Sequence, residues 1–226
     1  MPYRMRDNLS CCVIDGHAVF LDIEADLYFC LPDDLERAFI AYAAEANGAG
    51  AAIHKLVERR ILTPDNAMDR DMPPGQASAP LRSALEIPAL HARSGMTAVP
   101  ELMATLWTCR RQIRAKPFKE VLDRAARYRR QRCPPRTDAS GPACEQQLLQ
   151  AACIFNRARP YIPIATNCLL DSIALSRFLA RRHFRSDIVL GVTHEPFSAH
   201  CWVQAGDIAL NEAVGNAMAY TVIKVV

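Results

Sequence analysis

The sequence lacks several features that would place it in a simple class of protein. No uninterrupted run of roughly 18 apolar residues occurs, so we expect no membrane-spanning helix and no membrane partner. The formal net charge is only +3, which gives no reason to expect nucleic acid as a partner. The opening residues, MPYRMRDNLS, lack the apolar centre of a secretory signal. We therefore expect a cytoplasmic protein.

Cysteine pairs of the C-x-x-C type are also missing, although the chain has nine cysteines. Such pairs are typical of zinc and redox sites. Most of the cysteines lie in apolar surroundings such as "YFCL" and "QAACIF". This usage indicates a reduced protein whose thiols are mainly buried and structural, with one thiol at most in a chemical role.

The first third of the chain predicts a small domain of strands followed by helices. Half of all residues are hydrophobic and 23% are charged, which is a globular composition. Asp15-Gly16 is a strong hairpin signal between two apolar runs. The predicted elements are, in order, strands over 10–14, 17–23 and 27–31 and helices over 35–46 and 51–62. This arrangement is winged-helix-like and ends near Thr63.

A proline-rich stretch divides the chain into two predicted domains. Residues 64–100 contain six prolines, a composition that indicates a linker crossed by few contacts. Beyond it we expect helices over 98–115, 117–132, 144–158 and 165–183, a strand over 187–192 and a hairpin over 198–214. The last of these helices is apolar on nearly every side as far as Ala180, as a buried helix is. The predicted fold class is α+β, with domains over 1–85 and 86–226.

The C-terminal part holds the residues of a candidate cysteine-nucleophile site. Cys168 opens the buried helix after a capping Thr166-Asn167, where the positive end of the helix dipole favours the thiolate. His200, on the following strand, is the candidate general base. An acid on the returning strand could orient the imidazole, and Glu212 is favoured there over Asp207, which lies at the turn.

Plainer interpretations compete with this one. A buried cysteine is by default a small core residue, and a strand histidine is often structural. Zinc ligation by Cys168, His200, Cys201 and Glu212 is disfavoured because the neighbouring His200 and Cys201 point to opposite faces of a strand. We therefore expect no metal and no cofactor. Trp107 and Trp202 are expected in the core, and the basic stretch 124–132 on a solvated helix face.

The stretch "NCLLDSIALSRFLARRH", followed by "DIVLGV" and "EPFSAHCWVQAGDIALNE", resembles the transglutaminase-like leader peptidases of lasso-peptide biosynthesis. These are the B proteins, relatives of the papain-like fold, and the resemblance covers about residues 143–214. It implies that Cys168 is the nucleophile and His200 the base. The acid of the family falls at Glu212, where many members have aspartate.

The N-terminal segment "AVFLDIEADLYFCLPDDL" and the later "LVERRILTP" resemble the PqqD-like element that recognises precursor peptides. Such elements bind a leader peptide as an added strand beside the third strand, against the last helix. The resemblance implies leader binding by Tyr28, Phe29, Cys30, Leu56 and Arg59. The implied partners are a lasso precursor peptide and a separate ATP-dependent, asparagine-synthetase-like cyclase.

The function expected from the sequence is that of a cytoplasmic cysteine endopeptidase that removes the leader of a lasso-peptide precursor. An alternative is a non-catalytic scaffold that delivers the precursor to the cyclase, with Cys168 merely buried. A winged-helix regulator that binds DNA is a third possibility. The small net charge and the lack of a basic recognition helix weaken it.

Overall fold

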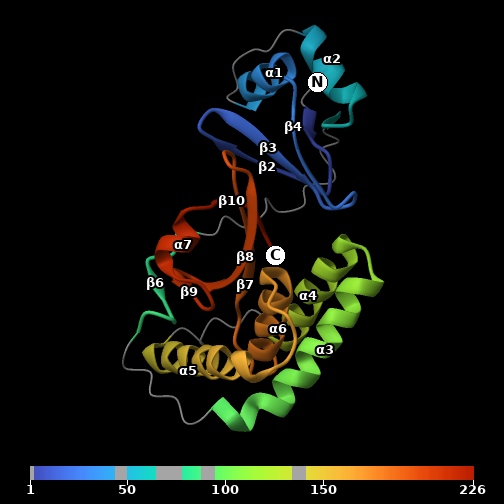
Figure 1. The fold of residues 1–226 in the computed structure, drawn as a ribbon. Coiled ribbons are helices and arrows are strands. Elements are labelled where there is room, and N and C mark those ends of the chain that lie inside the picture. The colour runs from blue at the N-terminus through green and yellow to red at the C-terminus, as the bar shows by residue number, and fades with distance from the viewer. Residues whose placement is uncertain (1–2, 44–49, 65–77, 88–94, 134–140) are drawn as a thin grey trace.

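The computed structural model describes residues 3–43, 50–64, 78–87, 95–133 and 141–226 (Figure 1). The strands in these ranges form three sheets, of two, five and three strands. The long helices of the C-terminal part gather to one side of the five-stranded sheet, and a smaller group of strands and helices lies at one end of it. Within the described ranges we find no helix that combines the length and the apolar character needed to cross a membrane.

The N-terminal part contains the predicted strands and both predicted helices. Its elements are β1 (Tyr3–Met5), β2 (Leu9–Ile14), β3 (His17–Asp22), β4 (Leu27–Cys30), α1 (Asp33–Ala43), α2 (Gly50–Glu58) and β5 (Leu62–Pro64). The three-stranded sheet has the order β2-β3-β4, and β1 pairs separately with β5. The predicted hairpin turn is confirmed, since Asp15 and Gly16 both have positive φ, at 51° and 87°.

The second predicted helix, over 51–62, is too long. Helix α2 ends at Glu58, and Arg60 adopts a left-handed φ of 57°. The Ile61 amide then donates to the Leu56 carbonyl at 2.9 Å, which closes the helix end. Leu62 pairs with Met5 in a strand that the sequence did not predict. Residues 44–46 of the first predicted helix lie outside the described residues.

The three-stranded sheet is buried on both faces, which contradicts the prediction that few contacts join the two parts of the chain. Ala18 and Phe20 of β3 belong to the core formed with α1 and α2, whereas Val19 and Leu21 belong to the core of the C-terminal part. All four are fully buried. The physical reason is visible in "AVFL", because a strand that is apolar at consecutive positions needs cover on both faces. Figure 1 shows this sheet lying across one end of the large sheet.

The large sheet has the order β10-β7-β8-β9-β6. Its strands are β6 (Arg82–Ser83), β7 (Asp187–Thr193), β8 (Ser198–Ala205), β9 (Ile208–Ala209) and β10 (Thr221–Val225). Strand β6 comes from the predicted linker and runs parallel to β9. The domain boundary predicted after residue 85 therefore follows a strand that pairs within the C-terminal sheet. Residues 65–77 and 88–94 of the linker lie outside the described residues.

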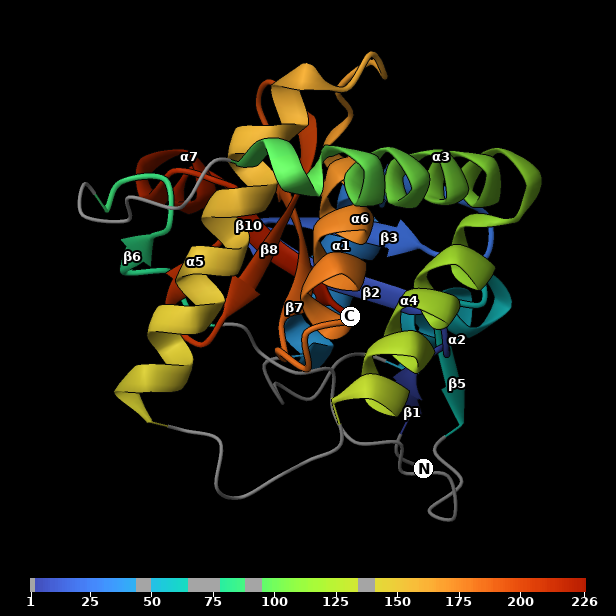
Figure 2. The same cartoon turned by 90° about the horizontal axis from the view of Figure 1, so that it is seen from below.

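Helix α6 is the central element of the C-terminal part. The helices here are α3 (Val99–Ala115), α4 (Phe118–Arg132), α5 (Pro142–Ala158), α6 (Cys168–Ala180) and α7 (Val214–Met218), with short 3-10 turns η1 (Gly95–Ala98) and η2 (Arg159–Tyr161). The four long ones were predicted to within a few residues, while α7 and β10 were not. Figure 2 shows α3 and α4 along one side of α6 and α5 along the other. As predicted, α6 is buried almost all round.

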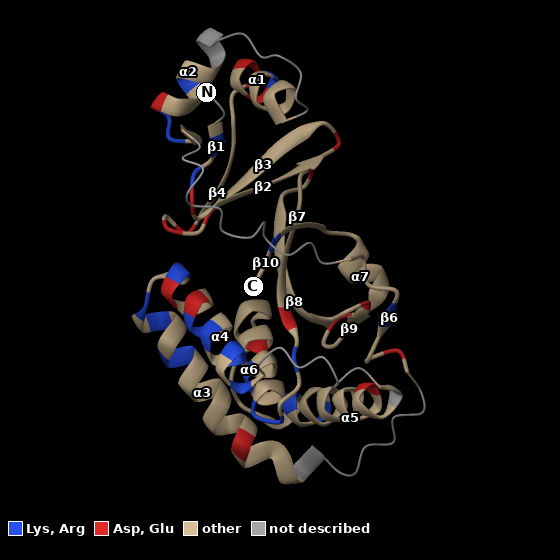
Figure 3. Ribbon diagram, turned by 180° about the vertical axis from the view of Figure 1, so that it is seen from behind, with Lys and Arg blue, Asp and Glu red and all other residues tan. Residues whose placement is uncertain are grey.

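Three predictions about individual side chains have different outcomes. Trp202 is fully buried, as expected. Trp107 is 56% exposed, with the Arg111 guanidinium 4.9 Å from its ring centroid, so its expected place in the core is wrong. Figure 3 shows Lys and Arg gathered along α3 and α4. Of these, Arg124 pairs with Glu120 on the surface, but Arg129 turns inward and bonds the Ser186 carbonyl at 2.9 Å.

Gly191 is needed because of a close approach between strands and side chains. It lies directly opposite His200 in the pairing of β7 with β8. A Cβ at Gly191 would come within 2.8 Å of the Trp202 ring and 2.8 Å of the Tyr220 Cβ. Both rings lie beside the His200 imidazole, at centroid distances of 6.2 Å and 5.1 Å.

We predict that Gly191→Ala lowers the free energy of unfolding by about 1–3 kcal/mol, because the buried Trp202 cannot move away without strain. The matched control is Gly215→Ala in α7, where a Cβ meets nothing within 4 Å and alanine favours the helix. Urea unfolding of both variants is the measurement. Equal stability of the two variants would contradict the close packing described for Gly191.

Candidate active site

Cys168 is the first residue of α6, as the sequence predicted. Asn167 has extended backbone angles and caps the helix, since its side-chain oxygen accepts a hydrogen bond from the Leu170 amide at 3.1 Å. The Cys168 thiol therefore lies at the positive end of the helix dipole, next to free backbone N–H groups. This position favours a thiolate and can also stabilise an oxyanion.

A buried arginine holds the segment that leads into Cys168. Arg159 is 7% exposed, and its Nε donates to Asp171 Oδ1, in the first turn of α6, at 2.7 Å. The same guanidinium donates to the carbonyls of Ile162, Ile164 and Ala165 at 3.4, 3.0 and 3.3 Å. The sequence gave no signal for this role, because Arg159-Pro160 reads only as a helix end. The contacts join the segment before Cys168 to the first turn of the helix that Cys168 begins.

His200 faces both a thiol and a carboxylate. Its Nε2 lies 2.5 Å from Glu212 Oε2, which leaves Nδ1 for the hydrogen bond with the Cys168 side chain. Cys201 is buried on the other side of β8, where its carbonyl accepts from Ser172 Oγ at 3.0 Å. His200 and Cys201 thus diverge, as the alternation of a strand requires.

Glu212 reaches His200 from a segment that is not a strand. The returning strand was expected to carry it, but β9 covers only two residues and ends before it. The Asn211 side chain replaces the missing strand pairing, since its oxygen accepts from the Val203 amide at 2.7 Å and its nitrogen donates to Ser172 Oγ at 3.3 Å. Ser83, beside β9, donates to the Glu212 carbonyl at 2.6 Å. Asn211 and Ser83 are supporting residues that sequence reasoning missed.

Asp207, the alternative acid, lies elsewhere. It occupies the turn after β8, and both of its carboxylate oxygens accept from Arg82, at 3.2 and 3.1 Å. Arg82 also bonds Glu145 at 2.6 Å, so the three residues form a surface network. Of the two candidate acids, Glu212 is the one hydrogen-bonded to His200.

The electrostatics of the three side chains favour their charged forms. The hydrogen bond from His200 lowers the pKa of Cys168 against the opposing effect of burial. The same contact, followed by that with Glu212, raises the pKa of His200. Burial alone would raise the pKa of Glu212, but hydrogen bonds from Asn216, His200 and the Ala213 amide together lower it. All three shifts act in the direction that favours a thiolate, an imidazolium and a carboxylate.

Buried and half-buried cysteines elsewhere show the opposite pKa shift. Burial raises the pKa of Cys11 to about 12, that of Cys12 to about 11 and that of Cys201 to about 12. These thiols therefore stay protonated near neutral pH and are structural, as the sequence suggested for most cysteines.

A cavity of about 230 Å³ opens beside Cys168 and His200. Its walls come from the junction of α3 and α4, from β7 and β8, and from the N-terminal sheet. The other lining residues are Asp26, Tyr28, Ile113, Lys116, Phe118, Val121, Leu169, Leu190, Ala199 and Cys201. A largely apolar cavity next to a nucleophile is suited to hold a side chain of a peptide substrate.

The five residues predicted to bind a leader peptide do not gather in one place. Phe29 packs against Phe20 in the N-terminal core, and Leu56 is fully buried there. Cys30 and Arg59 are exposed. Tyr28 points to the opposite face of the sheet from Phe29 and lines the cavity beside Cys168.

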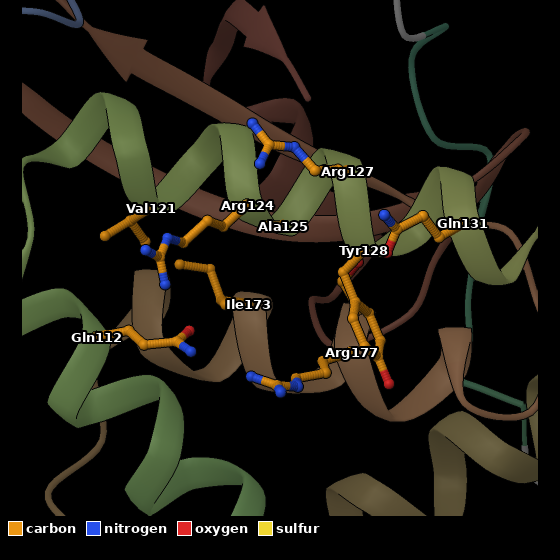
Figure 4. Close-up of a pocket in the computed structure, with 10 residues that line it drawn as sticks. Gln112, Val121, Arg124, Ala125, Arg127, Tyr128, Gln131, Ile173 and Arg177 are labelled. Carbon is orange, nitrogen blue, oxygen red and sulfur yellow. The ribbon is translucent and has the colours of Figure 1, made fainter.

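A second cavity, of about 210 Å³, lies between α3, α4 and α6 (Figure 4). It shares Val121 with the first cavity, and its polar lining includes Arg124, Arg127 and Arg177. Figure 4 shows the Arg124 side chain directed toward Gln112 and Ile173 of the facing helices. None of its described lining residues is a cysteine or a histidine, so the second cavity has no counterpart of the Cys168–His200 pair.

Comparison with known protein families identifies the class of this chain. The family model described as the transglutaminase-like superfamily matches residues 110–225, which include Cys168, His200 and Glu212. The chain belongs to this superfamily, which includes cysteine peptidases and transglutaminases. Residues 1–109 lie outside the match, and a PqqD-like domain in the N-terminal part stays a prediction.

The chain is also similar in sequence to a curated protein, the microcin J25-processing protein McjB of Escherichia coli. The two sequences are 40% identical over 48 residues, which cover 21% of this chain and 23% of the relative. The aligned region thus spans about a quarter of the curated relative's length. No solved structure matches the chain.

We predict that iodoacetamide modifies Cys168 faster than any other described cysteine at about pH 6, where ordinary thiols are protonated. Because the pKa of Cys168 is lowered, its thiolate is lost only when the pH falls through that lower value. Because the pKa of His200 is raised, the imidazolium persists until the pH rises past that higher value. Peptide mapping by mass spectrometry as a function of pH measures this window.

Exposed Cys30, whose pKa burial raises, is the internal control, and His200→Ala is the matched variant. The variant should lose most of the reactivity of Cys168 at about pH 6 and regain it only at alkaline pH. Similar rates for Cys168 and Cys30 throughout would contradict an activated thiolate.

Proposed function

We propose that this protein is a cysteine endopeptidase that removes the leader from a ribosomally made precursor peptide of the lasso type. The observation that carries the proposal is the hydrogen-bonded series Cys168–His200–Glu212 at the start of a buried helix. Superfamily membership and the similarity to a protein named for processing microcin J25 support it.

The geometry supports acyl transfer through a thioester. The Cys168 thiolate attacks the carbonyl carbon of the scissile bond, and the N-terminal amides of α6 stabilise the oxyanion that forms. The imidazolium of His200 then protonates the departing amine, while Glu212 stabilises its charge and orients the ring. Water attacks the thioester, His200 accepts its proton, and the leader leaves with a free carboxylate.

Leader capture is assigned to the N-terminal part. Among the described strands, β4 pairs only with β3, so its other edge is available for an added peptide strand. The exposed Cys30 lies on β4, and the exposed Arg59 follows α2. By resemblance, the partners are the precursor peptide and an asparagine-synthetase-like cyclase, and the setting is the cytoplasm.

A scaffold that only delivers the precursor remains the alternative function. Such a protein would have no use for a thiol at a helix start with a lowered pKa and an imidazole oriented by a carboxylate. The hydrogen bonds of Arg159 and Asn211 also hold Cys168 and Glu212 in place. A protein that only delivers a precursor does not require such fixed positions. These features favour the peptidase.

We predict that Cys168→Ala and His200→Ala each abolish leader removal and leave precursor binding unchanged. The first removes the nucleophile, and the second removes its base, while the proposed docking edge lies on another element. The substrate is a synthetic precursor peptide of the lasso type, with cleavage followed by mass spectrometry and binding by calorimetry. Leader removal by Cys168→Ala at the wild-type rate would refute the peptidase and leave the scaffold as the explanation.

We predict that Glu212→Gln slows cleavage on the order of ten- to a thousand-fold. The amide keeps the shape but loses the charge that stabilises the imidazolium. The matched control is Asp207→Asn, which removes a carboxylate from the same hairpin. The Asp207 carboxylate bonds Arg82 at the surface and not His200. Single-turnover rates of both variants are compared. A larger loss for Asp207→Asn would mean that Asp207 is the third member after all.

A further inference from the structure

The N-terminal sheet supplies part of the wall of the catalytic cavity. Tyr28 of β4 and Asp26 of the turn before β4 line the same 230 Å³ cavity as Cys168 and His200. Neither lies within the matched superfamily region, which begins at residue 110. A cleaving site built from the superfamily region alone would therefore lack one side.

The position of Tyr28 follows from the alternation of β4. Phe29 points into the N-terminal core, so its neighbour Tyr28 points to the other face of the sheet. There its ring packs against Phe197 at a centroid distance of 5.5 Å and an angle of 57°. Tyr28 lines the same cavity as Cys168, and Cys168 is close enough to act electrostatically on its phenol. The Tyr28 hydroxyl therefore belongs to the surroundings of Cys168.

The Tyr28 hydroxyl is a donor without a partner in the part of the chain that the structure describes. No described residue hydrogen-bonds it, although Tyr28 itself is half-buried. Burial, followed by the charges of Cys201, Asp26 and Cys168, raises the pKa of Tyr28 to about 12. The hydroxyl keeps its proton near neutral pH and can donate it to a hydrogen bond with a bound ligand.

Other polar side chains of the cavity are less suited to meet a developing negative charge. Asp26 is an acceptor when ionised and would repel an oxyanion. Lys116 could donate, but its ammonium lies 3.3 Å from Glu120 and its side chain is 41% exposed. Of Asp26, Lys116 and Tyr28, Tyr28 is the neutral hydrogen-bond donor. A donor already in place in a site that partly excludes water stabilises a transition state most strongly.

We propose that Tyr28 is a catalytic residue whose hydroxyl donates a hydrogen bond to the carbonyl oxygen of the scissile bond. The inference rests on the proposed peptidase function. As the Cys168 sulfur–carbon bond forms, the carbonyl electron pair moves onto oxygen, which then accepts from the α6 amides and from Tyr28. When the oxyanion collapses, the carbon–nitrogen bond breaks and His200 protonates the amine. The N-terminal part thus contributes to catalysis as well as to leader capture.

The test uses the full chain and compares Tyr28→Phe with Tyr42→Phe. The control also removes a hydroxyl from the N-terminal part, where Tyr42 bonds the Tyr3 backbone, away from the cavity. Wild-type cleavage of the precursor, and its absence in Cys168→Ala, is established first, because failure at that step refutes the proposed function rather than the role of Tyr28. Single-turnover rates at saturating precursor are then measured.

We expect Tyr28→Phe to cleave on the order of 100-fold more slowly, and Tyr42→Phe to cleave at nearly the wild-type rate. Precursor affinity, measured with Cys168→Ala as the background to prevent cleavage, should be unchanged by Tyr28→Phe. The rate of iodoacetamide modification of Cys168 should also be unchanged, since that reaction forms no oxyanion. A leader peptide that ends in an aldehyde at the scissile residue should bind Tyr28→Phe more weakly in proportion to the lost rate, because its tetrahedral adduct resembles the transition state.

Three results would overturn the proposal. One is cleavage by Tyr28→Phe within about twofold of the wild-type rate, because the loss of an oxyanion donor reduces the rate far more than that. Another is weaker precursor binding with an unchanged rate at saturation, which would make Tyr28 a leader-binding residue, as the sequence predicted. The third is slower alkylation of Cys168, which would mean that Tyr28 only supports the thiolate–imidazolium pair.

Discussion

The hydrogen bond between His200 and Glu212 joins β8 to the segment that follows β9, beyond the short stretch in which these two strands pair. His200 lies on β8, whereas Glu212 follows a strand of only two residues. The distance between them is set by the Asn211 side chain, which takes the place of a strand carbonyl, and by Ser83 from the neighbouring β6. Because the imidazole depends on the carboxylate and the thiolate on the imidazole, the site requires this short network. The buried Arg159 completes it by fixing the start of α6.

The second constraint is the double burial of the N-terminal sheet. Val19 and Leu21 belong to the C-terminal core, and Phe20 belongs to the N-terminal one. Separating the two parts would expose Val19 and Leu21, at a cost of roughly 1.5–3 kcal/mol for each large apolar side chain. A docked sheet also brings Tyr28 to the cavity beside Cys168. The part of the chain proposed to capture the leader is therefore packed against the part proposed to cleave it.

The sequence predicted those features that depend on local periodicity and capping. The Asn167 cap, the helix that Cys168 opens and the strand that carries His200 all have local signals, and the structure contains them. It also separated Glu212 from Asp207 by their places relative to the turn, and Glu212 is the one of the two that is hydrogen-bonded to His200. Other features depend on tertiary contacts. Nothing local distinguishes Arg159 as a buried anchor, or β6 as a strand within a proline-rich stretch.

The N-terminal part shows the same division between local and tertiary signals. Three strands and two helices were predictable, but the second helix stops early because Arg60 takes a left-handed conformation. Tyr28 and Phe29 were both assigned to leader binding, although adjacent strand residues face opposite ways. The sequence predicts that alternate side chains of this strand point to opposite faces of the sheet. It does not predict which face packs against the C-terminal part. That choice follows from the packing of Val19 and Leu21.

The central claim is that Cys168 attacks the carbonyl at the leader–core junction. The most direct measurement uses a leader peptide that carries a fluoromethyl ketone in place of the scissile amide, which alkylates a thiolate held at that carbonyl. Intact mass and peptide mapping then locate the modified residue. The account predicts a single adduct, on Cys168, that forms more slowly when Glu212 is replaced by glutamine. An adduct on another of the nine cysteines, or none under conditions in which the precursor is cleaved, would contradict it.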